Sequence, residues 1–176
     1  MNPLEYLAFT ILRVLRRLHL ARLVRIGSER NFTDYFKNFE KIETVKEIFG
    51  TKTEEVLRNL KVEFIGLFGY MGVDVSDGHL LINLRYLETG DKTDIYLDII
   101  HELCHVKQYM DGKELFDSKY NYVDRPTEIE AYRLTVKEAR RLGLSDERIL
   151  LYLETEWMSK NDLKRLAGYL SIDCQS

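Results

Sequence analysis

The sequence predicts an α+β protein in which a small sheet lies between helical segments. Apolar residues recur at intervals of three and four before residue 60 and after residue 93, as in amphipathic helices. Between these segments, short runs of valine, leucine and isoleucine are separated by turn signals, of which Ser76-Asp77-Gly78 is the clearest. The length of 176 residues favours a single domain, 1–176, which can bury a core without disulfides.

Residues 1–60 are expected to form an N-terminal helical appendage. Its first helix is predicted over residues 3–25, where Arg13, Arg16 and Arg17 interrupt the apolar run, so we expect neither a signal peptide nor a membrane span. The basic face is compatible with contact at an anionic membrane surface, whereas the amphipathic pattern favours packing on the domain or on a partner chain. Two further helices are predicted in the appendage, at 34–49 and, with Thr53 as N-cap, at 53–60.

Residues 61–142 are expected to contain the sheet and the two helices that pack on it. The pattern predicts a small, mostly antiparallel sheet within about residues 62–87. Its strand candidates are 62–67, 73–75 and 80–84, the last continuing towards 87. Two helices follow, at 94–110 with Thr93 as N-cap and at 126–142 between Pro126 and Gly143.

Residues 143–176 are expected to add C-terminal helices. Ser145 is a candidate N-cap for a helix that reaches about residue 156, and either Ser159 or Asn161 is a candidate for a helix that ends near residue 170. Serine and asparagine suit these positions because their side-chain oxygens accept hydrogen bonds from the first helical turn.

Charge and cysteine content weigh against several classes of function. With 26 basic and 29 acidic residues the net charge is −3, so we expect no nucleic-acid binding, and a helical DNA-associated regulator is disfavoured. The first 30 residues depart from this average, with six arginines against two glutamates. The two cysteines, Cys104 and Cys174, form no disulfide framework and favour a reducing compartment, the cytoplasm.

The most informative motif is His101-Glu102-Leu103-Cys104-His105, which lies inside a predicted helix. Residues four apart share a helical face, so both imidazoles can converge on one cation. Glu102 lies about 100° around the helix, where it can reach a metal-bound water without being a ligand. Two histidines and an adjacent glutamate at this spacing predict a zinc site with a general base.

A catalytic zinc usually has a third protein ligand, and the next predicted helix offers one. Glu128 is followed by Ala131, whose short side chain one turn later permits close contact with the histidine helix. Glu130 is the alternative ligand; it lies about 200° from Glu128, so the two cannot both face the metal. We expect Glu128 to be the ligand and Glu130 to meet solvent or a basic neighbour. The other histidines, His19 and His79, belong to different elements.

His101-Glu102-x-x-His105 followed by Glu128-x-x-Ala131 resembles the zincin metallopeptidases of the gluzincin type. The pattern is similar to minigluzincins and to the catalytic cores of membrane-embedded zinc peptidases, over about residues 60–142. The resemblance implies a zincin-like fold, in which a sheet covers an active-site helix and a second helix supplies the third ligand. One position departs from the family pattern: an aspartate often follows the alanine and supports a metal-binding histidine, and here that place is Tyr132.

Several other residues are candidates to support such a site. Asp98 and Gln108 flank the histidine face of the helix, where each could hold a histidine N–H or line the cleft. Cys104 borders this face, and we expect it to be a small packing residue. A hydrogen-bond donor for the tetrahedral oxyanion is also needed, and the candidates are Tyr120, Tyr122, Tyr132 and Arg133.

The sequence therefore predicts a zinc metalloendopeptidase that acts on peptide or protein substrates. Zinc on His101, His105 and Glu128 would lower the pKa of a bound water, and Glu102 would accept its proton. An extended substrate could pair with the exposed sheet edge that precedes the active helix. The alternative is a zincin-fold binding or regulatory protein that keeps a metal site with little or no turnover. The sequence leaves the oligomeric state open.

Overall fold

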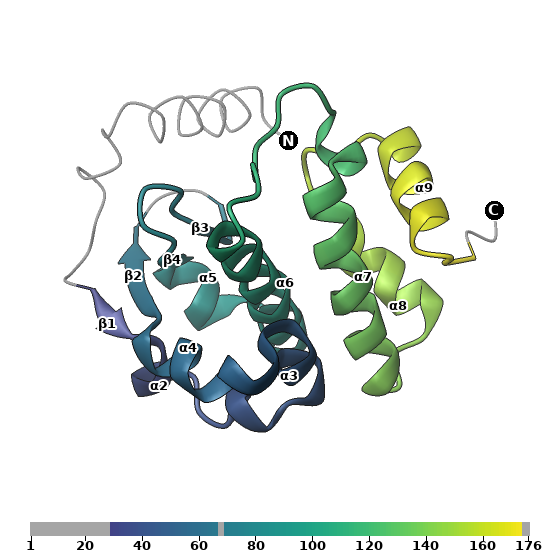
Figure 1. Cartoon of the computed structure of the whole chain (residues 1–176). Coiled ribbons are helices and arrows are strands. Elements are labelled where there is room, and N and C mark those ends of the chain that lie inside the picture. The colour runs from purple at the N-terminus through teal and green to yellow at the C-terminus, as the bar shows by residue number, and fades with distance from the viewer. Residues whose placement is uncertain (1–28, 67–68, 174–176) are drawn as a thin grey trace.

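Helix α6 (Lys92–Met110) lies at the centre of the fold, with a sheet on one side and helix α7 (Pro126–Arg141) on the other (Figure 1). The computed structural model describes residues 29–66 and 69–173, which form a mixed α+β arrangement, as predicted. The expected helix at 3–25 and Cys174 lie outside the described residues.

The sheet has four strands in the order β1-β2-β4-β3. Its strands are β1 (Arg30–Asn31), β2 (Lys61–Ile65), β3 (Met71–Val73) and β4 (Leu80–Asn83). The outer pairings, β1 with β2 and β3 with β4, are antiparallel, whereas the central pairing of β2 with β4 is parallel. Two of the three pairings are antiparallel, as predicted, but the parallel central pairing makes the sheet mixed. The reason is that β4 turns back from β3 and inserts between β3 and β2, which makes β3 an edge strand.

The turn from β3 to β4 is set by its own polar residues. Asp74 accepts a hydrogen bond from the backbone N–H of Ser76 at 2.9 Å, so the strand ends at Val73 instead of continuing to Val75. Gly78 has a φ of +82°, and a Cβ at this position would lie 2.4 Å from the ring of Tyr109 on α6. Only glycine fits both the backbone conformation and this close approach.

The segment after β4 is a helix, α5 (Leu84–Thr89), where the sequence predicted a strand continuing towards Leu87. The side chain of Asn83 accepts a hydrogen bond from the backbone N–H of Tyr86 at 3.2 Å. This N-cap ends the strand and starts the helix, and it overrides the β propensity of the apolar run.

The single helix predicted at 34–49 is divided into α2 (Phe32–Tyr35), the 3₁₀ turn η2 (Phe39–Lys41) and α3 (Glu43–Phe49). Asn38 between them adopts a φ of +66°, which interrupts the helical path. The 3₁₀ turn η3 (Gly50–Lys52) then leads into α4 (Thr53–Asn59). Thr53 is the first residue of α4 rather than its N-cap, because its hydroxyl donates to the carbonyl of Gly50 at 2.7 Å.

Residues 30–60 share one hydrophobic core with the sheet and α6. Phe32, Val45 and Leu57 are buried in the same cluster as Ile100 and Leu103 of α6. The expected boundary between residues 60 and 61 therefore falls inside this core. Burying these side chains stabilises the fold by roughly 1.5–3 kcal/mol for each large residue.

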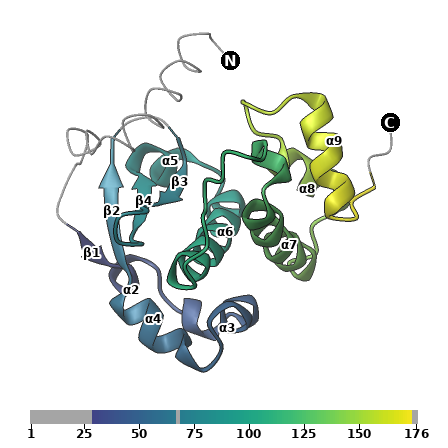
Figure 2. The ribbon, with the colours of Figure 1, turned by 45° about the horizontal axis from the view of Figure 1, so that its top comes forward.

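A second hydrophobic cluster joins α7, α8 (Asp146–Leu153) and α9 (Lys160–Tyr169), which pack together on the side of α6 away from the sheet (Figure 2). The predicted caps are confirmed: the side chain of Ser145 accepts from the N–H of Arg148, and Ser159 forms a capping box with Asp162. Helix α8 ends at Leu153, earlier than predicted.

The ends of α6 and α7 position the candidate site. Asp91, rather than Thr93, is the N-cap of α6, because its carboxylate accepts from the N–H groups of Thr93 and Asp94. The predicted end of α6 at Asp111-Gly112 and the start of α7 at Pro126 are confirmed.

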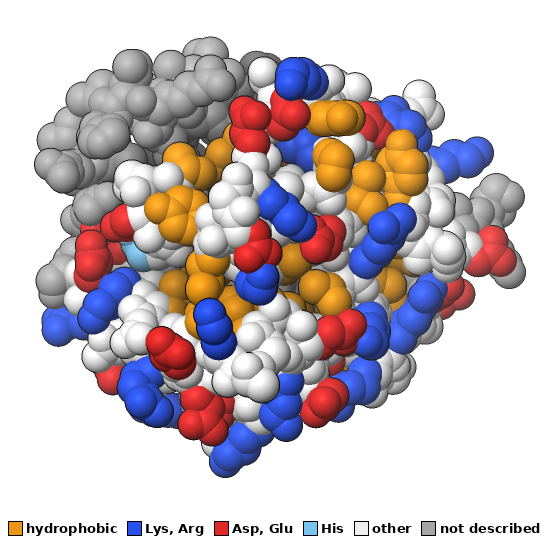
Figure 3. All heavy atoms as spheres, in the orientation of Figure 1, with side chains coloured by type: hydrophobic (Ala, Val, Ile, Leu, Met, Phe, Trp, Pro, Cys, Tyr) orange, Lys and Arg blue, Asp and Glu red, His pale blue; other side chains and the backbone are white. Residues whose placement is uncertain are grey.

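Basic and acidic side chains are interspersed on the face shown in Figure 3, so that face carries no extended field of one sign. Within residues 29–66 and 69–173, none of the helices has the length and apolar character needed to cross a membrane.

Candidate metal centre

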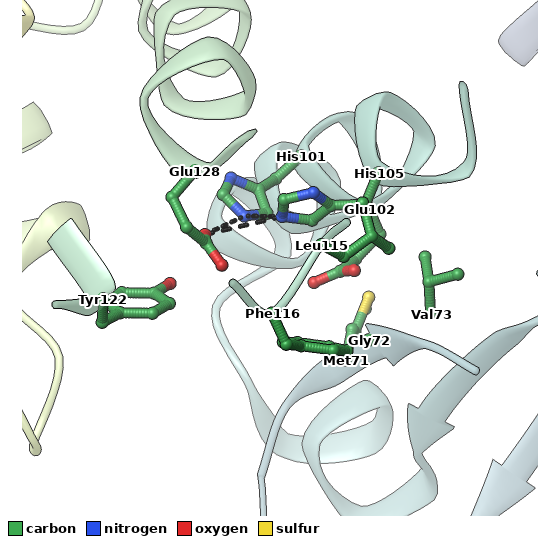
Figure 4. Close-up of a pocket in the computed structure, with 10 residues that line it drawn as sticks. All are labelled: Met71, Gly72, Val73, His101, Glu102, His105, Leu115, Phe116, Tyr122 and Glu128. Carbon is green, nitrogen blue, oxygen red and sulfur yellow. Dashed lines mark hydrogen bonds and ion pairs between the residues drawn. The ribbon is translucent and has the colours of Figure 1, made fainter. Parts of the chain in front are cut away.

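Helices α6 and α7 bring three side chains with metal-binding atoms to one point. His101 and His105 lie one turn apart on the face of α6 that meets α7, and Glu128 projects from the first turn of α7 (Figure 4). Ala131, one turn after Glu128, is fully buried, so there is no larger side chain to hold the helices apart. Leu103, between the histidines, points into the first hydrophobic core.

The three ligand atoms form a nearly equilateral triangle. His101 Nε2 and His105 Nε2 are 3.0 Å apart, and Glu128 Oε2 lies 3.4 Å from the first and 3.5 Å from the second. A tetrahedral zinc with bonds of about 2.0–2.1 Å has ligand atoms about 3.3 Å apart. Glu128 Oε2 also forms no hydrogen bond with any described residue, although it is buried. The donor set and its spacing therefore fit zinc.

The charges of these groups depend on one another. Burial would raise the pKa of Glu128, but the nearby imidazoles of His105 and His101 outweigh it and hold the pKa well below its usual range. Burial likewise opposes protonation of His105, but the carboxylate of Glu128 outweighs it and raises the pKa to about 9. The negative charge of the buried Glu128 carboxylate thus favours a proton on the imidazoles that face it. A metal cation at the same point would be stabilised by the same charge.

Glu102 lines a cleft next to this triangle without joining it. The cleft has a volume of about 100 Å³ and is bounded by α6, α7, the edge strand β3 and the segment between α6 and α7. Its walls are lined by the following residues: Met71, Gly72, Val73, His101, Glu102, His105, Leu115, Phe116, Tyr122 and Glu128. Figure 4 shows the carboxylate of Glu102 on the cleft side of the histidines, as a general base would require.

Gln108 holds the outer nitrogen of His105. Its Oε1 accepts from His105 Nδ1 at 2.7 Å, and its Nε2 donates to the carbonyl of Thr127 at 2.9 Å and to Glu130 Oε2 at 2.8 Å. Glu130 also accepts from Lys113 at 2.7 Å and lies outside the triangle. The expectation that Glu130 meets a basic neighbour is therefore confirmed.

Tyr132 packs against His101 instead of hydrogen-bonding to it. The two ring centroids are 4.3 Å apart, and the hydroxyl of Tyr132 pairs with the hydroxyl of Tyr122 at 2.8 Å. His101 Nδ1 has no hydrogen-bond partner among the described residues. The phenol ring thus supports the imidazole by a tilted ring contact, with 55° between the ring planes, and not by a hydrogen bond.

Asp98 binds two tyrosines rather than a histidine. Its carboxylate accepts from the hydroxyls of Tyr86 at 2.6 Å and Tyr152 at 2.8 Å. Burial raises the pKa of Asp98 to about 6, and the two hydroxyls oppose this rise. The network ties α5, α6 and α8 together next to the site.

The remaining predicted residues differ in whether they line the cleft. Tyr122 lines the cleft, whereas Tyr120 and Arg133 are exposed and do not line it. Cys104 is buried in the first hydrophobic core, and burial raises the pKa of its thiol to about 12, which leaves it a neutral packing residue.

A second histidine–carboxylate group lies at the start of β4. His79 is buried, and its Nδ1 pairs with Asp77 at 2.5 Å while its Nε2 pairs with buried Glu63 at 3.2 Å. A carboxylate oxygen of Glu29 lies close enough to ligand atoms of Asp77 and His79 for the three residues to hold one metal ion. Both ring nitrogens of His79 are thus already paired with carboxylates, so this group differs from the triangle on α6 and α7.

Sequence reasoning missed the cleft walls. Met71 and Val73 could have been inferred from the edge position of their strand, had the strand order been known. Leu115 and Phe116 lie in a polar segment whose pattern gives no signal of a cleft-lining role. No protein-family model, curated protein or solved structure matches the chain.

Proposed function

We propose that this protein is a zinc-dependent metallopeptidase of the gluzincin type. The observation that carries the proposal is the buried triangle of His101 Nε2, His105 Nε2 and Glu128 Oε2, whose sides of 3.0–3.5 Å match tetrahedral zinc. The cleft beside the triangle, with a glutamate in its wall, adds the space and the base that a hydrolase needs. The resemblance of the two sequence patterns to gluzincins agrees with this arrangement.

The residues would divide the chemistry as follows. His101, His105 and Glu128 would hold zinc, which when bound acts as a Lewis acid and lowers the pKa of water towards 7. Glu102 would accept the proton of the attacking water and return it to the leaving amine, so that it acts first as base and then as acid.

Tyr122 is the best-placed donor for the oxyanion of the tetrahedral intermediate. Of the four candidates, Tyr120 and Arg133 do not line the cleft, and Tyr132 lies behind His101 with its hydroxyl on Tyr122. Burial and the carboxylate of Glu128 raise the pKa of Tyr122 well above its usual value, so its hydroxyl stays protonated and can donate.

Strand β3 provides a place for an extended peptide substrate. The hydrogen bonds from Asn83 N–H to Tyr70 O and from Asp74 N–H to His79 O place Tyr70 and Asp74 in the paired positions. Because pairing alternates along an antiparallel ladder, the N–H and C=O groups of Met71 and Val73 point away from β4. A peptide that adds to this edge would pass the wall of the cleft.

The proposal is tested first by metal analysis of the purified protein. We expect one zinc per chain, and loss of it in a His101→Ala, His105→Ala variant. Cleavage of an unfolded protein such as casein should depend on the zinc and stop on chelation. Zinc at one equivalent without any cleavage would instead favour the alternative of a binding or regulatory protein.

The Glu102→Gln variant separates the base from the ligands. The substitution is nearly isosteric, so we expect an unchanged fold and one bound zinc, with hydrolysis reduced on the order of 10²–10⁴-fold. Loss of zinc from this variant would show that Glu102 is a ligand, and the assignment of roles would be wrong.

A further inference from the structure

We propose that Gln108, Glu130 and Lys113 form a positioning relay that runs from the protein surface to His105 and sets the metal affinity of the site. The inference rests on the proposed metal centre and concerns residues outside it. Each link is a hydrogen bond of 2.7–2.8 Å, from His105 to Gln108, from Gln108 to Glu130 and from Lys113 to Glu130. We call these three residues the Gln108 relay.

The first link fixes the tautomer of His105. Gln108 is buried, with 1% of its surface exposed, and its Oε1 accepts the Nδ1–H of His105. With the proton held on Nδ1, the lone pair of Nε2 faces Glu128 and His101, where a metal would bind. Such outer hydrogen bonds orient ligand imidazoles and raise their basicity.

The second link fixes the amide of Gln108. A glutamine amide can turn over and present its NH₂ group in place of its oxygen, and this turn would point a donor at the Nδ1–H. Here both amide hydrogens already have acceptors, one in the carbonyl of Thr127 and one in Glu130 Oε2. Thr127 and Glu130 flank Glu128 on α7, so the helix that supplies the third ligand also orients the second.

The third link reaches the surface. Lys113 and Glu130 have side chains 44% and 47% exposed, and Lys113 belongs to the segment that follows α6. An isolated ion pair at this exposure contributes little to stability. Its role in the relay is instead to hold the carboxylate of Glu130 in the position that receives the Gln108 amide.

The relay changes what we expect for Glu130. From the sequence, Glu130 is expected to face away from the metal, and on that ground alone its removal would leave zinc binding nearly intact. The structure connects it to the metal centre through Gln108, so its removal should cause a small, measurable loss. Thr127 still holds one amide hydrogen when Glu130 is absent, which keeps the loss below that of removing Gln108.

The test is zinc affinity, measured by competition with a chelator, in a series of variants. We expect Gln108→Leu to weaken zinc binding roughly 10–100-fold and Glu130→Ala roughly 3–10-fold. Glu130→Gln keeps an oxygen that accepts from Gln108, so it should restore affinity to within about threefold of the native protein. Cobalt in place of zinc gives a second readout, because the visible bands should shift in Gln108→Leu when the His105 ring is free to reorient.

The matched control is the neighbouring ion pair of Lys107 with Asp111, which is similarly exposed and whose side chains, among the described residues, share no hydrogen bond with Gln108, Glu130 or Lys113. Lys107→Met should leave zinc affinity unchanged, whereas Lys113→Met should lower it slightly. Equal affinities in the native protein, Gln108→Leu and Glu130→Ala would overturn the relay. So would an equal loss in Lys107→Met and Lys113→Met, since that result would show that removing a lysine has the same effect whether or not it contacts Glu130.

The outcomes also separate the relay from the proposed function. If the native protein binds no zinc, both the metal centre and the relay are contradicted. If it binds zinc and all the variants bind zinc with the same affinity, the relay alone is contradicted. The expected affinity series without any peptide cleavage would support the relay and contradict the peptidase. If Gln108→Leu does not fold, the zinc affinities of the surface variants Glu130→Ala and Glu130→Gln still test the relay.

Discussion

The two ends of the α6–α7 contact each bury a glutamate of α7, and the two carboxylates are used differently. Glu138, near the end of α7, accepts hydrogen bonds from Tyr96 of α6, Thr44 of α3 and Arg141 of its own helix. Glu128, in the first turn, has an oxygen that forms no hydrogen bond with any described residue and faces two imidazole nitrogens.

The comparison shows that burial alone does not mark a functional carboxylate. Both groups are almost completely buried, and in both the neighbouring groups lower the pKa against the effect of burial. The difference lies in the partners: Glu138 is surrounded by donors that satisfy it, whereas Glu128 faces two imidazole nitrogens and a cleft. We therefore expect Glu138 to stabilise the fold and Glu128 to bind a ligand.

The largest effect is expected for Glu128→Ala on zinc binding. Zinc sites with four ligands bind with about 10–16 kcal/mol, so the loss of one ligand should cost about 3–4 kcal/mol, or roughly 200–1000-fold in affinity. Isothermal titration of the native protein and the variant measures this. An unchanged zinc affinity in Glu128→Ala, with a large loss in Glu130→Ala, would mean that the wrong glutamate of α7 has been assigned to the metal.

The reciprocal substitution is Glu138→Ala, which should destabilise the fold and leave the metal centre unchanged. Removing the carboxylate leaves buried hydroxyl groups without an acceptor and should lower the free energy of unfolding by about 3 kcal/mol. The two glutamates are ten residues apart, or about 15 Å along the helix, so the zinc stoichiometry should stay the same. Urea unfolding and metal analysis on the same samples test both statements. A stable Glu138→Ala variant that loses its zinc would contradict the division of roles.

The third expected effect is a change in the pH dependence of stability. Burial raises the pKa of Glu138, but hydrogen bonds from Arg141, Tyr96 and Thr44 outweigh it and lower the pKa to about 2, from 4.5 in an unfolded chain. The stabilisation is therefore fully present above about pH 4.5 and is lost as the pH falls towards 2. The difference in unfolding free energy between the native protein and Glu138→Gln should shrink over this window by up to about 1.4 kcal/mol per pH unit. A difference that stays constant from pH 6 to pH 2.5 would mean that the carboxylate gains nothing from these donors.

The sequence predicted which side chains of α6 and α7 lie together better than it predicted the sheet, and there are physical reasons for this. His101 and His105 are fixed relative to each other by one turn of helix, so their shared face follows from the spacing alone. Glu128 could be chosen over Glu130 because a helix cannot present both on one face. The partners of Gln108 and Asp98 depend on how separate elements pack, and no local pattern contains that information.

The errors in the fold arose where a single side chain overrides a propensity. Asn83 caps a helix inside an apolar run, Asn38 interrupts an otherwise periodic segment, and Asp91 caps α6 two residues before the expected Thr93. Each of these side chains competes for nearby backbone N–H groups or tolerates a left-handed conformation. The cap at Ser145 was predicted outright, and Ser159 was one of two candidates with Asn161, because serine side chains at these positions accept from the first helical turn.

The edge position of β3 also bears on how the cleft moves. Among the strands that the structure describes, β2 and β4 each have a neighbour on both sides, whereas β3 is paired with β4 alone, over three residues. Local opening of a protein begins where the fewest interactions must be broken. The wall formed by Met71 and Val73 can therefore detach at a lower free-energy cost than the helices that carry the histidines and Glu128. Movement of this strand would then widen the cleft for a bulky ligand, while the three metal-binding atoms keep their spacing.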